Sequence, residues 1–174
     1  MKTRKLTTAS ILTALALALS WIERLIPLEL LIPLPGIKLG LANTVTLFAL
    51  YTMDFPSAAL ILAARCLIGG LFSGNLTALA FSLTGGAFSM VAMAVAKRSQ
   101  HLSVYGVSVL GAAAHNCGQI LVASVLMHSM YIVFYLPYLL IIGTVCGCAT
   151  ATVAAGVLRA LRASGKALGR NEAR

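Results

Sequence analysis

The stretch "IPLPGIKLGLAN", residues 32–43, interrupts a chain that is otherwise almost entirely apolar. Its two prolines suit a connection between two helices, where no helix needs the backbone N–H that proline lacks, and Gly36 lets the chain turn. The small residues after Lys38 then begin another helix. The sequence therefore predicts a helix–turn–helix junction, and it leaves open whether Lys38 and Asn43 serve the turn or a binding site.

The composition around this junction identifies lipid as the natural solvent. Of the 174 residues, 60% are hydrophobic and 10% are charged, and the mean hydropathy is +0.96. A soluble domain carries about a quarter charged residues, so this chain has too few to cover a water-facing surface. Because a bilayer core about 30 Å thick needs about 20 apolar residues per helix, the length allows about five to seven spans and no second domain.

Hydropathy and helix breakers divide the chain into six apolar segments. We expect an all-α, polytopic membrane protein in which six transmembrane helices form one compact domain over residues 1–174. The first segment is of spanning length, so it is predicted to be a retained helix and not a cleaved signal peptide. The predicted spans are 6–26, 38–53, 56–72, 76–96, 102–127 and 132–161, followed by a basic tail, 162–174.

Ten of the thirteen lysines and arginines cluster at the start, between the fourth and fifth spans, and at the end of the chain. Six spans bring all three clusters to one side, which the positive-inside rule assigns to the cytoplasm. Both termini are therefore predicted to be cytoplasmic, in a bacterial inner membrane. Clusters that flank apolar segments also argue against nucleic acid as the reason for the net charge of +9.

Polar side chains within the apolar segments mark a candidate binding site, because ionisable groups are costly in a membrane. Arg65 lies near the middle of a span and needs a partner, water or an anionic ligand. His115 and Gln119 are four residues apart and share a helix face, with Asn116 about 100° away. The predicted substrate-binding residues are Lys38, Asn43, Arg65, Asn75, His115, Asn116 and Gln119.

The depth of these residues suggests a pocket that opens to the outer side and holds a small anionic molecule. Structural alternatives remain open: Glu23 and Arg24 suit interfacial anchors, and Asn43 suits a hydrogen bond between helices. Glu23 is also the one intramembrane carboxylate that could pair with Arg65. The cysteine spacing fits neither a zinc nor a redox site, so no metal or cofactor is predicted.

Four stretches together resemble a known family: "PGIKLGLANTVTLFALY" (35–51), "RCLIGGLFSG" (65–74), "SLTGGAFSM" (82–90) and "GAAAHNCGQ" (111–119). They are similar to the Gx transporter family, which is also described as heptaprenyl diphosphate synthase component I. That family in turn resembles the substrate-binding S components of energy-coupling factor transporters. These are six-helix membrane proteins that capture small molecules from outside.

The resemblance implies an importer subunit whose first helix meets a transmembrane coupling subunit through small residues, here Ser10, Ala14 and Ala18. A separate ATPase pair would supply energy, since the chain has no phosphate-binding loop of its own. The alternative is a non-catalytic membrane partner of heptaprenyl diphosphate synthase in isoprenoid or menaquinone metabolism. Prenyl elongation needs Mg²⁺ held by carboxylates. With four acidic residues and no Asp-rich motif, the chain is predicted not to be an enzyme.

Overall fold

The computed structural model describes residues 2–25 and 40–171, and within these ranges the chain is helical and has no strand. The helices are α1 (Lys2–Arg24), α2 (Asn43–Thr52), α3 (Phe55–Ser73), α4 (Leu76–Ala96), α5 (Val104–Leu126), the 3₁₀-helix η2 (Met130–Tyr135) and α6 (Leu136–Asn171). Five helical segments of the described chain are long and apolar enough to cross a membrane. The predicted all-α, multi-pass fold is confirmed.

The helix α2 differs most from its prediction. A helix was expected from residue 38, but residues 40–42 form a turn, and residues 38 and 39 lie outside the described ranges. Gly40 has a φ of +81°, a left-handed conformation that glycine adopts without steric cost. The backbone N–H of Asn43 donates to the Gly40 carbonyl at 2.8 Å and closes this turn. With ten residues, α2 is about 15 Å long, roughly half the thickness of a bilayer core.

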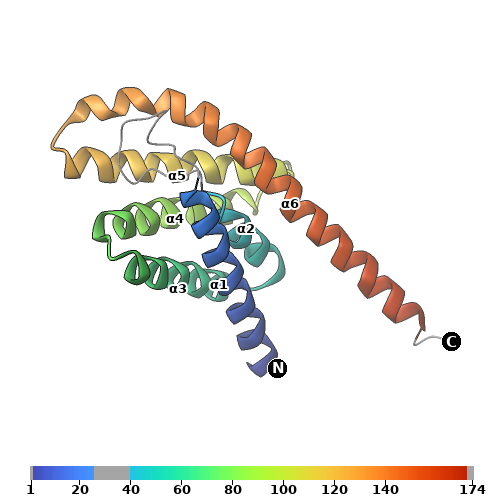
Figure 1. Ribbon diagram of the computed structural model, residues 1–174. Helices are drawn as coiled ribbons and strands as arrows, with labels where there is room; N and C mark the ends of the chain where they lie inside the picture. Colours follow the sequence, from blue (N-terminus) through green and yellow to red (C-terminus); the bar gives the residue numbers. More distant parts are fainter. Residues whose placement is uncertain (1, 26–39, 172–174) are drawn as a thin grey trace.

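This short helix lies at the centre of the molecule. It contacts all five other α-helices, and Leu47 and Ala49 are almost completely buried. Figure 1 shows α3, α4 and α5 side by side as a layer, with α1 crossing it and α6 running past the other helices to the C-terminus. The residues that begin α2 are therefore surrounded by the bundle, and Asn43 is buried among the other helices.

Small residues allow α4, α5 and α6 to approach closely. A Cβ atom on Gly118 of α5 would lie 3.0 Å from both the Cα of Gly85 and the carbonyl oxygen of Thr84 on α4. On the other side of α5, the Ser108 hydroxyl donates to the Gly147 carbonyl of α6 at 2.8 Å. Close backbone packing thus joins α4 to α5, and a buried hydrogen bond joins α5 to α6.

The last helix is longer than predicted at its C-terminal end. Residues 130–135 form η2, and α6 then continues through the predicted basic tail as far as Asn171. The predicted span 132–161 agrees closely with the apolar segment of membrane-spanning length, Met130–Ala163, and the helix itself continues beyond that span. Alanine, leucine, arginine and lysine are strong helix formers, and no proline interrupts α6 after Pro137 in its first turn.

Candidate functional site

Arg65 connects three helices in the interior. Its side chain is 7% exposed. One terminal nitrogen, Nη2, donates to Asn43 Oδ1 of α2 at 3.1 Å, and Nη1 donates to Ser20 Oγ of α1 at 3.5 Å. Among the described residues, its Nε has no hydrogen-bond partner, and no carboxylate lies within ion-pair distance of the guanidinium. The Nε–H donor of a buried cation is therefore left unused by the described chain.

A buried carboxylate contacts the turn that precedes α2. Glu23 of α1 is 4% exposed, and its Oε1 accepts the backbone N–H of Gly40. The N-terminal end of a helix carries partial positive charge, which favours an anion nearby. The beginning of α2 is therefore held by two buried contacts, one from Glu23 to Gly40 and one from Arg65 to Asn43.

Two glycines of α4 make room for this arrangement. A Cβ atom on Gly85 would lie 2.8 Å from His115 Cε1, and one on Gly86 would lie 3.4 Å from Arg65 Nη2. His115 also approaches the turn before α2, because a Cβ atom on Gly40 would lie 3.3 Å from its Cδ2. The Gly85–Gly86 pair thus lets His115 of α5 and Arg65 of α3 approach the same part of α4.

We call Ser20, Glu23, Gly40, Asn43, Arg65 and His115 the Arg65 cluster. It is closely packed. The crevice beside Arg65 has a volume of about 10 Å³, enough for roughly one water molecule. It is lined by Ser20, Arg65, Cys66, Gly69, Gly70, Ala78 and Ser82. A larger ligand could enter this crevice only if side chains moved.

The other predicted site residues lie in different surroundings. Asn116 faces α6, where its Nδ2 donates to the Leu139 carbonyl at 2.7 Å. Gln119 is fully buried, one turn beyond His115 on the same face of α5. Asn75 is exposed and is the N-cap of α4, with its Oδ1 accepting the Ala78 N–H at 3.0 Å. Lys38 lies outside the described residues.

The faces of α1 separate two groups of residues. Ala9, Leu12 and Ala16 are buried against the bundle. Ser10, Ala14 and Ala18, the predicted partner-binding residues, are exposed on the opposite side. The buried positions are spaced by three, four and seven residues and end at Glu23, so helical periodicity was the signal that could have placed Glu23 in the interior.

The described residues contain no group of three or more His, Cys, Asp or Glu side chains that could hold a metal ion. Their two carboxylates are at different places: Glu23 is buried near the start of α2, whereas Asp54 is exposed just beyond its end. The Asp54 carboxylate accepts from Lys5 Nζ at 3.4 Å. A hydrogen bond from Ser57, together with the nearby Lys5, holds the pKa of Asp54 below its ordinary value of 3.8.

Asp54 belongs to an end of the molecule where basic residues gather, which we call the basic end. Arg4 and Lys5 of α1 line a crevice there together with Leu161 of α6. At the same end of α2, Lys97 donates to the Leu50 carbonyl, and its Nζ lies 5.1 Å from the centre of the Tyr51 ring. The start of α1, the end of α4 and Leu161 of α6 therefore lie around the same end of α2.

The helices and the Arg65 cluster define the class of protein: an all-α, multi-pass membrane protein with a buried polar junction at its centre. A family model described as heptaprenyl diphosphate synthase component I matches residues 12–157. The chain belongs to this family. The comparisons with curated proteins and with solved structures give no match.

Proposed function

We propose that this chain is a non-catalytic membrane subunit that works with the catalytic component of a heptaprenyl diphosphate synthase. The observation that carries the proposal is the family match over residues 12–157, because the family is described as component I of that synthase. A component I implies a second component, which would perform the chemistry. The subunit would bring that component to the membrane, where a product with a long apolar chain accumulates.

The acidic residues support a non-catalytic role. Elongation of a prenyl chain ionises an allylic diphosphate held by Mg²⁺, and Mg²⁺ requires oxygen ligands that come mainly from carboxylates. The sequence has four acidic residues: Glu23, Glu29, Asp54 and Glu172. Glu23 and Asp54 flank opposite ends of α2, a helix about 15 Å long, so these two cannot share one ion. The second component would have to supply the metal ligands.

We place the basic end in the bacterial cytoplasm, together with both termini. Lys97 and Arg98 follow α4 directly, and Arg4 and Lys5 lie at the start of α1. Lysine and arginine are enriched in cytoplasmic loops of inner-membrane proteins. In this orientation a soluble catalytic component would approach the membrane from the side of the basic end.

The test is co-purification. The affinity-tagged chain is isolated from membranes of its native host in mild detergent, and the eluate is assayed for elongation of an allylic diphosphate with isopentenyl diphosphate. We expect a catalytic prenyl synthase subunit in the eluate and elongation activity above that of a mock purification. An eluate that lacks such a subunit and such activity would contradict the proposal.

A second candidate is capture of a small anionic molecule for an energy-coupling factor importer. It is favoured by the Nε of Arg65, which is buried without a hydrogen-bond partner among the described residues and lies beside a crevice. Asn43, His115 and Gln119 would complete this site. The exposed face formed by Ser10, Ala14 and Ala18 would contact the coupling subunit.

This candidate function predicts different partner proteins. An ATPase pair and a coupling subunit should then co-purify with the chain and should be lost from the Ala14→Trp variant. Val153→Trp is the matched control, because Val153 is also exposed but lies on α6. If both variants retain the ATPase pair and the coupling subunit equally, the exposed face of α1 does not bind the coupling subunit.

A further inference from the structure

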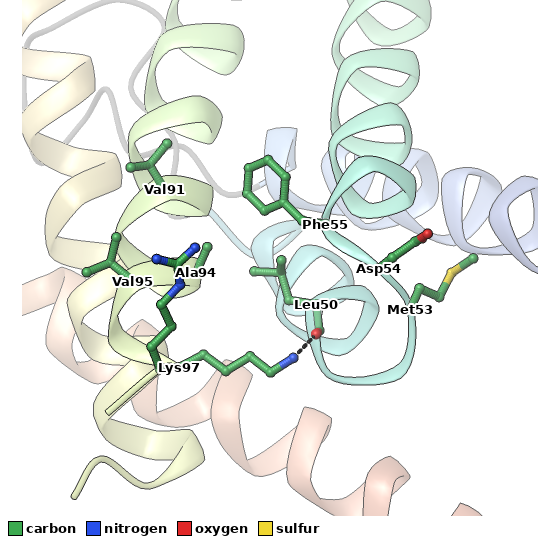
Figure 2. A pocket seen from close by; sticks show the side chains of 9 residues that line it. Leu50, Met53, Asp54, Phe55, Val91, Ala94, Val95 and Lys97 are labelled. Atoms are coloured by element: carbon green, nitrogen blue, oxygen red, sulfur yellow. Dashed lines mark hydrogen bonds between the residues drawn. The ribbon is translucent and has the colours of Figure 1, made fainter. Parts of the chain in front are cut away.

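A groove at the basic end is much larger than the crevice beside Arg65. Its volume is about 500 Å³, within the range of about 300–1,000 Å³ that is usual for small-molecule sites. The groove lies where the end of α4 faces the junction between α2 and α3 (Figure 2). Its lining residues are Leu50, Met53, Asp54, Phe55, Val91, Ala94, Val95, Lys97 and Arg98.

The walls of the groove are apolar. Figure 2 shows Val91 and Val95 of α4 on one side, with Leu50 and Phe55 on the other. Val91, Val95 and Phe55 are all exposed, so their side chains are not covered by another part of the described chain. A hydrocarbon chain lying along them would bury apolar surface on both sides, which favours binding.

Two cations that are adjacent in sequence, Lys97 and Arg98, also line the groove. Lys97 is held there by its hydrogen bond to the Leu50 carbonyl and by the Tyr51 ring, and its ammonium group has three donors in all. The side chain of Arg98 makes no hydrogen bond or ion pair with the described residues. Its five N–H donors are therefore available to a ligand. The one carboxylate of the lining, Asp54, lies away from Lys97 in Figure 2 and is paired with Lys5.

We infer that this groove binds a prenyl diphosphate, with the prenyl chain between the apolar walls and the diphosphate at Lys97 and Arg98. The inference rests on the proposed function, because the family description supplies this class of compound. Arginine binds phosphate through a planar fork and lysine through a compact charge, so neighbouring residues of both types suit a diphosphate. One groove with apolar walls suits a single prenyl chain better than the two chains of a phospholipid.

The probe is farnesyl diphosphate, titrated into the full chain reconstituted in phosphatidylcholine nanodiscs. We expect saturable binding, with farnesol and inorganic diphosphate each at least about tenfold weaker because each lacks half of the ligand. Arg98→Gln should weaken binding by about tenfold or more, and Arg98→Lys by less. Val91→Trp should also weaken it, because the indole would fill the groove.

Two control variants test whether the same changes elsewhere in the protein also weaken binding. Arg159→Gln removes the same charge from an exposed position on α6, and Val153→Trp adds the same bulk to an exposed valine. Both should bind farnesyl diphosphate as the unmodified chain does. Equal affinity for farnesol and farnesyl diphosphate, or equal affinity of the groove and control variants, would overturn the inference. So would loss of binding in phosphatidylglycerol nanodiscs, since the groove would then be occupied by an anionic phospholipid.

The binding result is independent of the co-purification result. Recovery of a catalytic synthase subunit without farnesyl diphosphate binding would overturn the groove assignment alone. Binding that depends on Arg98 and Val91, but without a catalytic subunit in the eluate, would overturn the proposed function and leave the groove as a ligand site.

Discussion

Arginine meets apolar helices at two places in this molecule, and the surroundings differ. Arg65 is buried, donates to Asn43 and Ser20, and borders a crevice of about 10 Å³. Arg98 lines a groove of about 500 Å³ and has no side-chain partner among the described residues. The first arginine fixes the start of a central helix, whereas the second leaves its donors available to a ligand.

The physical cause of this difference is solvation. A cation among apolar helices loses its hydration, so neighbouring side chains must accept its hydrogen bonds. At the end of a helix, water can solvate the guanidinium, and no protein acceptor is needed. The Arg65 cluster should therefore be sensitive to any change in packing, while the basic end should tolerate substitution.

The largest loss of stability is expected from Gly118→Leu. The new side chain would begin 3.0 Å from backbone atoms of Thr84 and Gly85, and neither can move without separating α4 from α5. Overpacking of this kind costs about 3 kcal/mol or more in the free energy of unfolding. Gly156→Leu is the control, because no atom lies within 4 Å of its added Cβ. Thermal unfolding in detergent, followed by circular dichroism, should show a much lower unfolding temperature for Gly118→Leu and little change for Gly156→Leu.

Asn43→Ala should have the next largest effect. It removes the acceptor of Arg65 Nη2 and leaves more of a buried cation unsatisfied, at a cost of about 1–3 kcal/mol. Asn43→Asp keeps an acceptor of the same shape and should retain most of the stability. If thermal unfolding finds Asn43→Ala as stable as the unmodified chain, the Arg65 cluster does not hold α2 in place.

A smaller effect is expected from Asn75→Ala. Asn75 caps α4 by accepting the Ala78 N–H, and loss of such a cap costs about 1 kcal/mol. Asn75→Ser should restore most of the stability, because serine is also a good cap. If Asn75→Ser unfolds at the same temperature as Asn75→Ala, the cap is not what stabilises α4.

The smallest effect concerns Asp54 at the basic end. Because its folded-state pKa is lowered below 3.8 by Ser57 and Lys5, its contribution to stability is present above that value and is lost as the pH falls through the folded-state pKa. Both partners of the Lys5–Asp54 pair are exposed, so solvent screening keeps the contribution small. Asp54→Asn should flatten the acid side of a melting-temperature profile. An unchanged profile would contradict this assignment.

The long helices could be predicted because apolar runs and their breakers are local features. The span predicted at 76–96 coincides with α4, and the other long helices differ mainly at their ends. Arg65 was recognised as a residue that needs partners, because a cation in an apolar segment is costly wherever the helix lies. The N-cap role of Asn75 could not be separated from a ligand contact in the sequence, because an asparagine before a helix looks the same in both cases.

The sequence by itself determined that this is an all-α membrane protein with its cations gathered mainly at three positions, because lipid solvation and helix formation depend on composition and local order. The tertiary structure alone decided that α2 begins in the interior. It also decided that Gly85 and Gly86 make room for His115 and Arg65, and that Lys97 and Arg98 border an apolar groove. These features depend on which faces of distant helices meet, and packing between segments remote in sequence leaves little trace in the order of the residues.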